Sequence, residues 1–304
     1  MKGLELCRRY FEEYGRPLIE KYGGYGISAG VAGYGSECFG YDDEYSKDHD
    51  FEPFFYIWLD DETDRETGFE LNKAYRRLPT EYLGIKAAER SLYGARKGGV
   101  STVKDFFRAF TGLDGLPRTG PEWIRIPEYA LAAAVNGEIF ANGCKEFSAA
   151  RTELMKGYPE DVLKKKLSAA LANMAQSGQY NYFRCLKRGE RGAAELAAAE
   201  FVKSGLKALY LLNNAYAPFY KWIFKGAASL EKCGSLTAEF EKILTEKDLY
   251  EKGRLIEEVC AATVSELRRQ GYTELGSDYL EPHAVYIAET VKDLDLKFMH
   301  LLEG

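Results

Sequence analysis

The sequence has little of what builds metal clusters or disulfide frameworks. Its six cysteines are scattered over 304 residues with no CxxC pair, and none of its three histidines stands at ligand spacing from a cysteine. Structural zinc sites and disulfide scaffolds need closely spaced ligands or paired cysteines. We therefore expect neither.

Long apolar runs and an excess of positive charge are also missing. No stretch approaches the roughly 20 apolar residues that cross a membrane, and the first ten residues carry charge where a signal peptide needs an apolar run. The formal net charge is −6, whereas proteins that bind nucleic acids usually present a basic surface. We expect a cytoplasmic protein without a membrane partner, and the charge argues against nucleic acid as a partner.

The pattern of residue types along the chain predicts an α+β fold in two domains, residues 1–146 and 147–304. Residues 2–22 have the apolar spacing of an amphipathic helix, whereas residues 27–59 are rich in glycine, aromatic and β-branched residues, which is typical of a sheet. Phe54–Leu59 is the clearest strand, followed by an acidic turn at Asp60–Glu66. Further helices are expected near 69–78 and 103–110, and then over 160–175, 193–213, 236–244, 249–270 and 284–302 in a helical bundle.

The segment with the most chemical information contains Gly35-Ser36 and, about a dozen residues later, Asp48-His49-Asp50 ahead of the apolar strand. A Gly-Ser turn lets backbone amides and a hydroxyl approach phosphate oxygens closely. On a strand, Asp48 and Asp50 would point to the same side while His49 points away. The pattern predicts a phosphate site beside a pair of carboxylates.

Two carboxylates so close together repel each other, and a divalent cation compensates them. Magnesium held by Asp48 and Asp50 is therefore the expected metal, bridging a nucleoside triphosphate. Alternatively, Gly35-Ser36 is merely a turn and the two aspartates are solvated at a sheet edge. The combination of both features at this spacing, before a strand, favours the metal.

These residues resemble the signature of a known superfamily. The Gly-Ser and Asp-x-Asp signature resembles that of the DNA polymerase beta-like nucleotidyltransferases, and the two-part layout is similar to the aminoglycoside and lincosamide nucleotidyltransferases. The resemblance implies a mixed sheet with flanking helices, with Gly35, Ser36, Asp48 and Asp50 at one edge, and a C-terminal helical bundle that closes over the nucleotide.

A closer resemblance covers most of the chain and points to an uncharacterised bacterial family with a nucleotidyltransferase-like domain. It rests on segments in both halves, namely Gly35-Ser-Glu-Cys-Phe-Gly, Asp48-His-Asp-Phe, Gln179-Tyr-Asn-Tyr, Leu211-Leu-Asn-Asn and Tyr216-Ala-Pro-Phe-Tyr-Lys-Trp222. It implies no particular substrate.

One feature of the superfamily is missing from its expected place. A third carboxylate usually stands on a neighbouring strand, and the candidate strand near residues 98–103 has none. Asp105, Glu128 and Glu138 are the candidates to replace it. Asp105 could instead cap a helix, and Glu138 could be a surface residue of a strand or turn.

Two basic residues of the second half are candidates for binding the nucleotide. Lys221 stands among aromatic residues that would bury its stem and direct its ammonium group to a triphosphate. Arg184 follows a polar and aromatic run and could meet phosphate or stack on a base. The alternatives are a snorkelling lysine on a packed helix and a surface arginine.

Together these features predict a magnesium-dependent nucleotidyltransferase, with a two-metal site at Asp48 and Asp50. It would move a nucleoside monophosphate from a triphosphate, ATP being expected, to a hydroxyl or amine of an unknown small molecule, with release of pyrophosphate. Two alternatives stay open. One is a catalytically silent nucleotide-binding or regulatory protein of the same fold, and the other is nucleotidylation of a protein or an RNA.

Overall fold

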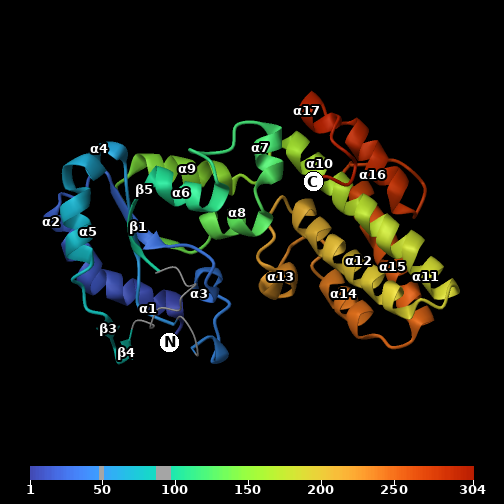
Figure 1. Cartoon of the computed structure of the whole chain (residues 1–304), viewed down its shortest axis with the longest axis horizontal. Helices are drawn as coiled ribbons and strands as arrows, with labels where there is room; N and C mark the ends of the chain where they lie inside the picture. Colours follow the sequence, from blue (N-terminus) through green and yellow to red (C-terminus); the bar gives the residue numbers. More distant parts are fainter. Residues whose placement is uncertain (48–50, 87–96) are drawn as a thin grey trace. The chain divides into compact units, whose positions relative to one another are not determined.

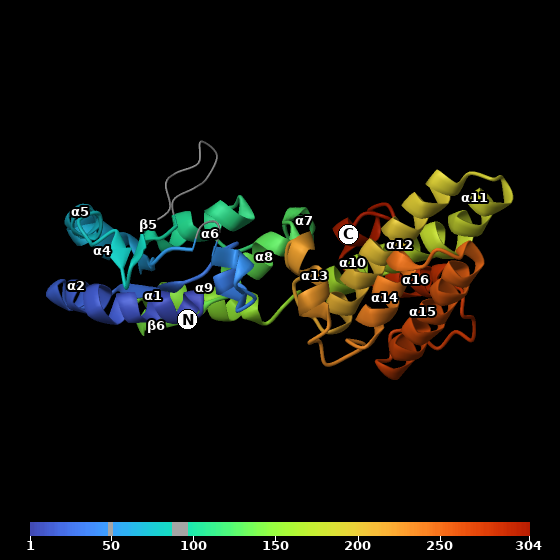
Figure 2. The same cartoon turned by 90° about the horizontal axis from the view of Figure 1, so that it is seen from below.

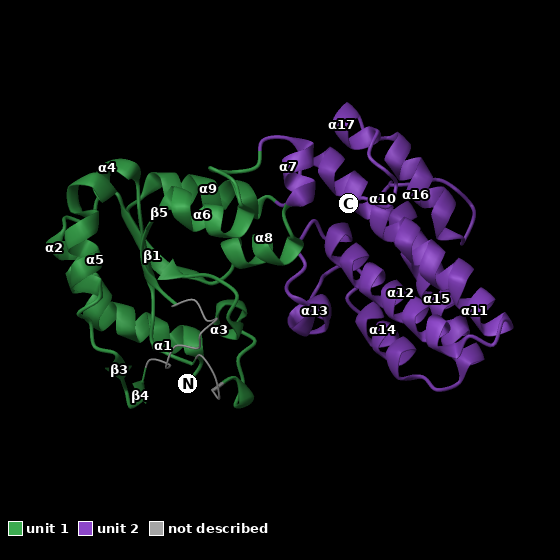
Figure 3. Ribbon diagram, in the orientation of Figure 1, with its two compact units in different colours: residues 1–117, 126–156 green, residues 118–125, 157–304 purple. Residues whose placement is uncertain are grey.

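The computed structural model describes residues 1–47, 51–86 and 97–304, and these divide into two compact units. The first unit comprises residues 1–117 and 126–156, and the second comprises residues 118–125 and 157–304 (Figure 3). The chain therefore passes from one unit to the other three times.

A four-stranded mixed sheet forms the centre of the first unit (Figure 1). The strand order is β5-β2-β1-β6, in which β1 runs antiparallel to both β2 and β6 while β2 and β5 are parallel. All five residues of β1 are buried, as expected of a strand with a neighbour on each side. The strands are β1 (Ile27–Val31), β2 (Tyr56–Leu59), β5 (Gly99–Thr102) and β6 (Glu138–Asn142), and a separate hairpin joins β3 (Glu81–Tyr82) to β4 (Ile85–Lys86).

Helices pack on both faces of this sheet because side chains alternate along each strand. On one face Ile57 shares a buried cluster with Tyr10 and Phe11 of the opening helical segment. On the other face Trp58 stacks on Phe147, with ring centroids 4.0 Å apart. The helical elements of the first unit are α1 (Gly3–Tyr10), η1 (Phe11–Gly15), α2 (Arg16–Lys21), α3 (Ser36–Phe39), η2 (Tyr45–Lys47), α4 (Asp61–Thr63), η3 (Asp64–Gly68), α5 (Phe69–Tyr75), α6 (Val103–Thr111), α8 (Glu128–Val135) and α9 (Lys145–Met155).

The acidic stretch after β2 is helical, so the predicted turn at Asp60–Glu66 is wrong. Asp60 is the N-cap of α4, and its carboxylate accepts a hydrogen bond of 2.8 Å from the Thr63 backbone N–H. Carboxylates are favourable at this position because they meet the unpaired amides and the positive end of the helix dipole. The acidic residues therefore begin the helix that the apolar pattern continues.

The second unit is entirely helical in its described elements, with α10 packed against both α12 and α16. The helix expected over 284–302 is two helices, because Asp161 accepts the backbone N–H groups of Lys292 and Asp293 between them. The elements are α7 (Gly120–Arg125), α10 (Glu160–Met174), η4 (Ala175–Tyr182), α11 (Phe183–Lys187), α12 (Arg191–Leu212), α13 (Tyr220–Ala227), α14 (Leu236–Thr245), α15 (Leu249–Arg269), α16 (Leu280–Glu289) and α17 (Leu294–Lys297).

This architecture confirms the predicted α+β class, with a small mixed sheet in the N-terminal half and helices in the C-terminal half. Across the described ranges, no helix combines the length and the apolar character needed to span a lipid bilayer.

Candidate functional site

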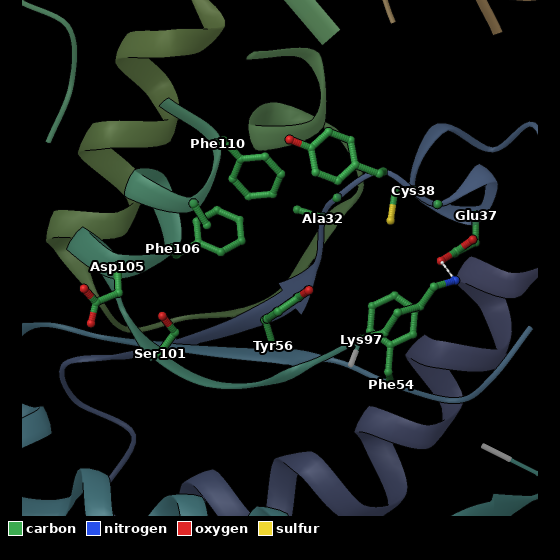
Figure 4. Close-up of a pocket in the computed structure, with 14 residues that line it drawn as sticks. Ala32, Glu37, Cys38, Phe54, Tyr56, Lys97, Ser101, Asp105, Phe106 and Phe110 are labelled. Atoms are coloured by element: carbon green, nitrogen blue, oxygen red, sulfur yellow. Dashed lines mark hydrogen bonds and ion pairs between the residues drawn. The ribbon is translucent and has the colours of Figure 1, made fainter. Parts of the chain in front are cut away.

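A pocket of about 430 Å³ opens in the first unit, at one end of the sheet (Figure 4). Because β1 is antiparallel to β2 and β2 is parallel to β5, the carboxyl end of β1 meets the amino ends of β2 and β5 there. The lining comes from the loop after β1, the residues that lead into β2 and β5, and one side of α6.

Asn136 holds the glycine loop at the edge of this pocket. The Gly33 backbone N–H donates to the Asn136 Oδ1 atom at 2.9 Å, and the Asn136 Nδ2 atom donates to the Gly33 carbonyl at 2.7 Å. The Gly33 φ angle is 137°, which side chains other than glycine rarely allow. The loop that carries Gly33 and Gly35 thus has one defined position beside the pocket.

The Glu37 carboxylate lies against Gly35. The Glu37 side chain folds back so that a Cβ atom on Gly35 would collide with its carboxylate. Glu37 is buried, 7% exposed, although it carries a charge. Ser36 is half-buried as the first residue of α3, between these two residues. Gly35 therefore leaves room for the Glu37 carboxylate in the conformation that the structure shows.

The partner of Glu37 is Lys97. The Lys97 Nζ atom lies 2.7 Å from the Glu37 Oε1 atom, and both residues line the pocket. The Lys97 side chain is 20% exposed, and its ammonium group lies 5.5 Å from the centre of the Phe54 ring. This pair brings together residues 60 positions apart in the sequence.

Aromatic rings form much of the pocket wall. Tyr56 of β2 meets Phe106 of α6 edge-on with ring centroids 5.7 Å apart, and Tyr34 of the glycine loop lies 5.3 Å from Phe110. Burial raises the pKa of Tyr56, so its phenol is protonated at neutral pH. The wall is suited to a flat apolar ring.

The pocket has polar groups at two opposite sides. Figure 4 shows Ser101 and Asp105 on one side and the Glu37–Lys97 pair on the other, with Tyr56 and Phe106 between them. Among the described lining residues, the charged side chains are two carboxylates and one ammonium group, a net charge of −1.

Asp48 and Asp50, the predicted metal ligands, lie outside the described residues, and so does His49. Phe54, four positions after Asp50, lines the pocket. Within residues 1–47, 51–86 and 97–304, no group of three histidine, cysteine, aspartate or glutamate side chains is arranged to hold a metal ion. The metal site stays a prediction.

The three candidates for the third carboxylate lie in different surroundings. Asp105 lines the pocket and also pairs with Arg108, at 3.1 Å between the Oδ1 and Nη1 atoms. It is not the cap of α6, because Thr102 accepts the Asp105 backbone N–H. Glu138 forms an ion pair with Arg8 of α1. Glu128 begins α8, and of the three candidates Asp105 alone belongs to the described lining of the pocket.

The two basic candidates both lie in the second unit. Lys221 is exposed on α13, with its ammonium group 5.2 Å from the centre of the Trp222 ring. Arg184 is exposed on α11 and stacks on Tyr180 at 4.6 Å. The two helices occupy opposite ends of this unit (Figure 1 and Figure 2), so the two side chains do not form one site within it.

Motif residues of the second half have structural partners. Gln179 receives the Leu280 backbone N–H at the start of α16 and donates to Glu257. Asn213 receives the Lys232 backbone N–H, and Asn214 receives that of Tyr158. These side chains pair with backbone N–H groups at a helix start and in connecting segments of the helical unit.

Among the polar residues in or beside the pocket, sequence reasoning did not single out Glu37, Lys97 or Asn136. Glu37 stands within the Gly-Ser motif, so its place beside Gly35 was a usable signal. Lys97 and Asn136 reach the loop from 60 and 103 positions away, respectively, and no local pattern marks such partners.

Residues 123–223 match the model of a family described as a domain of unknown function, DUF4037. The matched segment begins in α7 and ends in α13, so it includes parts of both units. No curated protein matches the chain. Neither finding names an activity.

Proposed function

We propose that this protein is a magnesium-dependent nucleotidyltransferase. The observation that carries the proposal is the glycine loop, fixed by Asn136 beside an aromatic pocket at the end of β1. A nucleotide combines a flat ring, which such a wall accommodates, with phosphates, which backbone amides of a glycine loop can meet. Asp48 and Asp50 follow this loop in the sequence and precede β2.

The charge of the pocket is compatible with a cation that arrives with the phosphates. Phosphates alone would meet a net negative lining, because Glu37 and Asp105 outnumber Lys97. The carboxylates of Asp48 and Asp50 are the hard oxygen donors that magnesium prefers. When bound, magnesium supplies neutralisation of the charge that develops on the α-phosphate and on the departing pyrophosphate.

In the proposed reaction, an acceptor oxygen or nitrogen attacks the α-phosphorus, and the bond from that phosphorus to the bridging oxygen breaks. The electron pair of this bond leaves with pyrophosphate, and the proton of the acceptor passes to a carboxylate. Aromatic residues hold the base of the nucleotide, and the glycine loop orients its phosphates.

A pyrophosphate-release screen tests this function. The purified protein is incubated with magnesium, each of the four triphosphates, and pools of metabolites, aminoglycosides or tRNA. We expect pyrophosphate release with at least one pool, and loss of that release in Asp50→Asn. Failure of every triphosphate to bind would overturn the proposal.

The second candidate is a nucleotide-binding protein that performs no transfer. The ion pairs of Glu138 with Arg8 and of Asp105 with Arg108 favour it, since two of the three candidate carboxylates are held by cations. Tight binding of a triphosphate without pyrophosphate release in any pool would support this alternative.

A further inference from the structure

We propose that Lys97 is the residue of this pocket that binds the phosphates, and that Glu37 is its positioning residue. The inference rests on the proposed nucleotide site and assigns to a residue of the pocket the role that the sequence suggested for Lys221. It makes the ligand one with a phosphate at the Lys97 side and a flat ring against the aromatic wall.

The burial of the Glu37–Lys97 pair is the first reason. The Glu37 side chain is 9% exposed and that of Lys97 is 20% exposed, with 2.7 Å between the Nζ and Oε1 atoms. Replacing a buried ion pair by apolar residues of similar size is often neutral or stabilising. A pair of this kind is therefore weak evidence for a purely structural role.

The surroundings of the pair are the second reason. Lys97 and Glu37 line the same pocket as Gly33 and Gly35, whose backbone is fixed by Asn136. An ammonium group has three N–H donors, so it can hold a carboxylate and a phosphate oxygen at the same time. Glu37 thereby restricts a flexible lysine side chain to the pocket.

The distribution of polar groups indicates how the ligand is oriented in the pocket. The Asp105 and Ser101 side of the pocket offers a carboxylate and a hydroxyl, which would repel or poorly neutralise phosphates (Figure 4). Phosphates are therefore directed to the opposite side, where Lys97 supplies the cation. The ring then lies against the aromatic wall that includes Tyr56 and Phe106.

Binding of inorganic tripolyphosphate and of ATP, each with magnesium, tests the inference by calorimetry. Lys97→Met should weaken both ligands by roughly ten- to a hundredfold, the effect of one charge-assisted hydrogen bond. Glu37→Gln removes the negative charge but keeps an acceptor oxygen for the Lys97 ammonium group, so binding should be unchanged or tighter. Glu37→Ala removes the group that positions Lys97 and should weaken both ligands. Lys104→Met, which removes an exposed lysine next to Asp105, should leave both affinities nearly unchanged.

A structural role predicts a different pattern. If the pair only braces the fold, Lys97→Met and Glu37→Gln should lower the melting temperature by similar amounts and leave the affinity of the folded protein unchanged. That result would overturn the inference. Weakening by Lys97→Met that is matched by Lys104→Met would also overturn it, because the effect would then reflect net charge alone.

The outcomes separate this inference from the proposed transferase activity. Tripolyphosphate binding that depends on Lys97, without pyrophosphate release from any triphosphate, supports the role of Lys97 and contradicts the transferase activity. Pyrophosphate release with an unchanged ATP affinity in Lys97→Met supports the transferase and removes the role of Lys97. No binding of either ligand to the unaltered protein overturns both.

Discussion

Asp48 and Asp50 are the residues on which the metal dependence of the proposed reaction rests. Asp48→Asn and Asp50→Asn should each suppress magnesium-dependent ATP binding, because one carboxylate alone leaves the ion under-coordinated. The melting temperature should stay the same or rise, since a repulsion between like charges is relieved. Calorimetry and thermal melting measure the two effects.

Glu44→Gln serves as the control for these two variants. Glu44 is exposed in the segment that precedes the aspartates, and its loss changes the net charge by the same amount. It should leave ATP binding intact. Normal magnesium-dependent binding in both aspartate variants would contradict the metal assignment.

Cys7 gives a second prediction at the level of a single residue. Burial raises the pKa of its thiol to about 12, whereas an unfolded cysteine titrates near 8.5. Because the unfolded chain loses this proton first, the stability that the neutral thiol provides is complete below about pH 8.5 and is lost as pH rises toward 12. The loss approaches roughly 1.4 kcal/mol per pH unit.

Melting temperatures measured between pH 8 and pH 10.5 check this expectation. Cys7→Ala should decline less steeply with pH than the unaltered protein, even if its stability is lower throughout. Val31→Ala, at a buried residue of the same cluster that carries no titratable group, should keep the original slope. Equal slopes in all three proteins would show that Cys7 does not contribute.

Among the elements, the loop after β1 depends on a partner that is distant in the sequence. Asn136→Ala removes both hydrogen bonds to Gly33, which should lower the free energy of unfolding by about 1–3 kcal/mol. Because the loop then loses its fixed position, ATP binding should also weaken. Asn136→Asp keeps the acceptor and loses the donor. Its free energy of unfolding, measured with a denaturant, should lie between those of the unaltered protein and Asn136→Ala. An unchanged ATP affinity in Asn136→Ala would mean that the loop position does not matter for the ligand.

Most long helices were predictable from the sequence, and so were α6 and α14, whereas several other short helices were not. The apolar periodicity predicted α10 and α15 to within about one residue of the observed ends, because many turns repeat one pattern. The helices α7 and α8 were missed, since a segment of two turns shows too little periodicity. The acidic start of α4 was mistaken for a turn because its capping role depends on the helix that follows.

The same distinction applies to the pocket. Gly35 was named from a local pattern, a glycine turn. Asp105 was named as a substitute for the carboxylate missing from the neighbouring strand, and both residues line the pocket. The contacts of Lys97 with Glu37 and of Asn136 with Gly33 follow from strand order. Neighbours in a sheet that are distant in sequence leave no periodic signal in a single chain.

For the whole molecule, α7 offers a test of the division into two units. Trp123 of α7 is buried and meets Tyr158 edge-on, with ring centroids 5.8 Å apart. Trp123→Ala should cost about 3–5 kcal/mol, and hydrogen exchange should show the lost protection in residues 157–304 while β1 and β2 keep theirs. Phe147→Ala, which removes the ring stacked on Trp58, should show the reverse. Equal loosening of both units in either variant would contradict the division.

The three crossings of the chain between the units restrict how this protein can be divided or recombined. A break after residue 156 leaves α7 with the wrong fragment, because residues 118–125 belong with the helices that begin at 160. A break after residue 117 separates α8, β6 and α9 from the rest of the first unit, to which they belong. Gene fusion, truncation or exchange at one point therefore cannot transfer either unit intact. A single recombination event can therefore add or remove these units only as a pair.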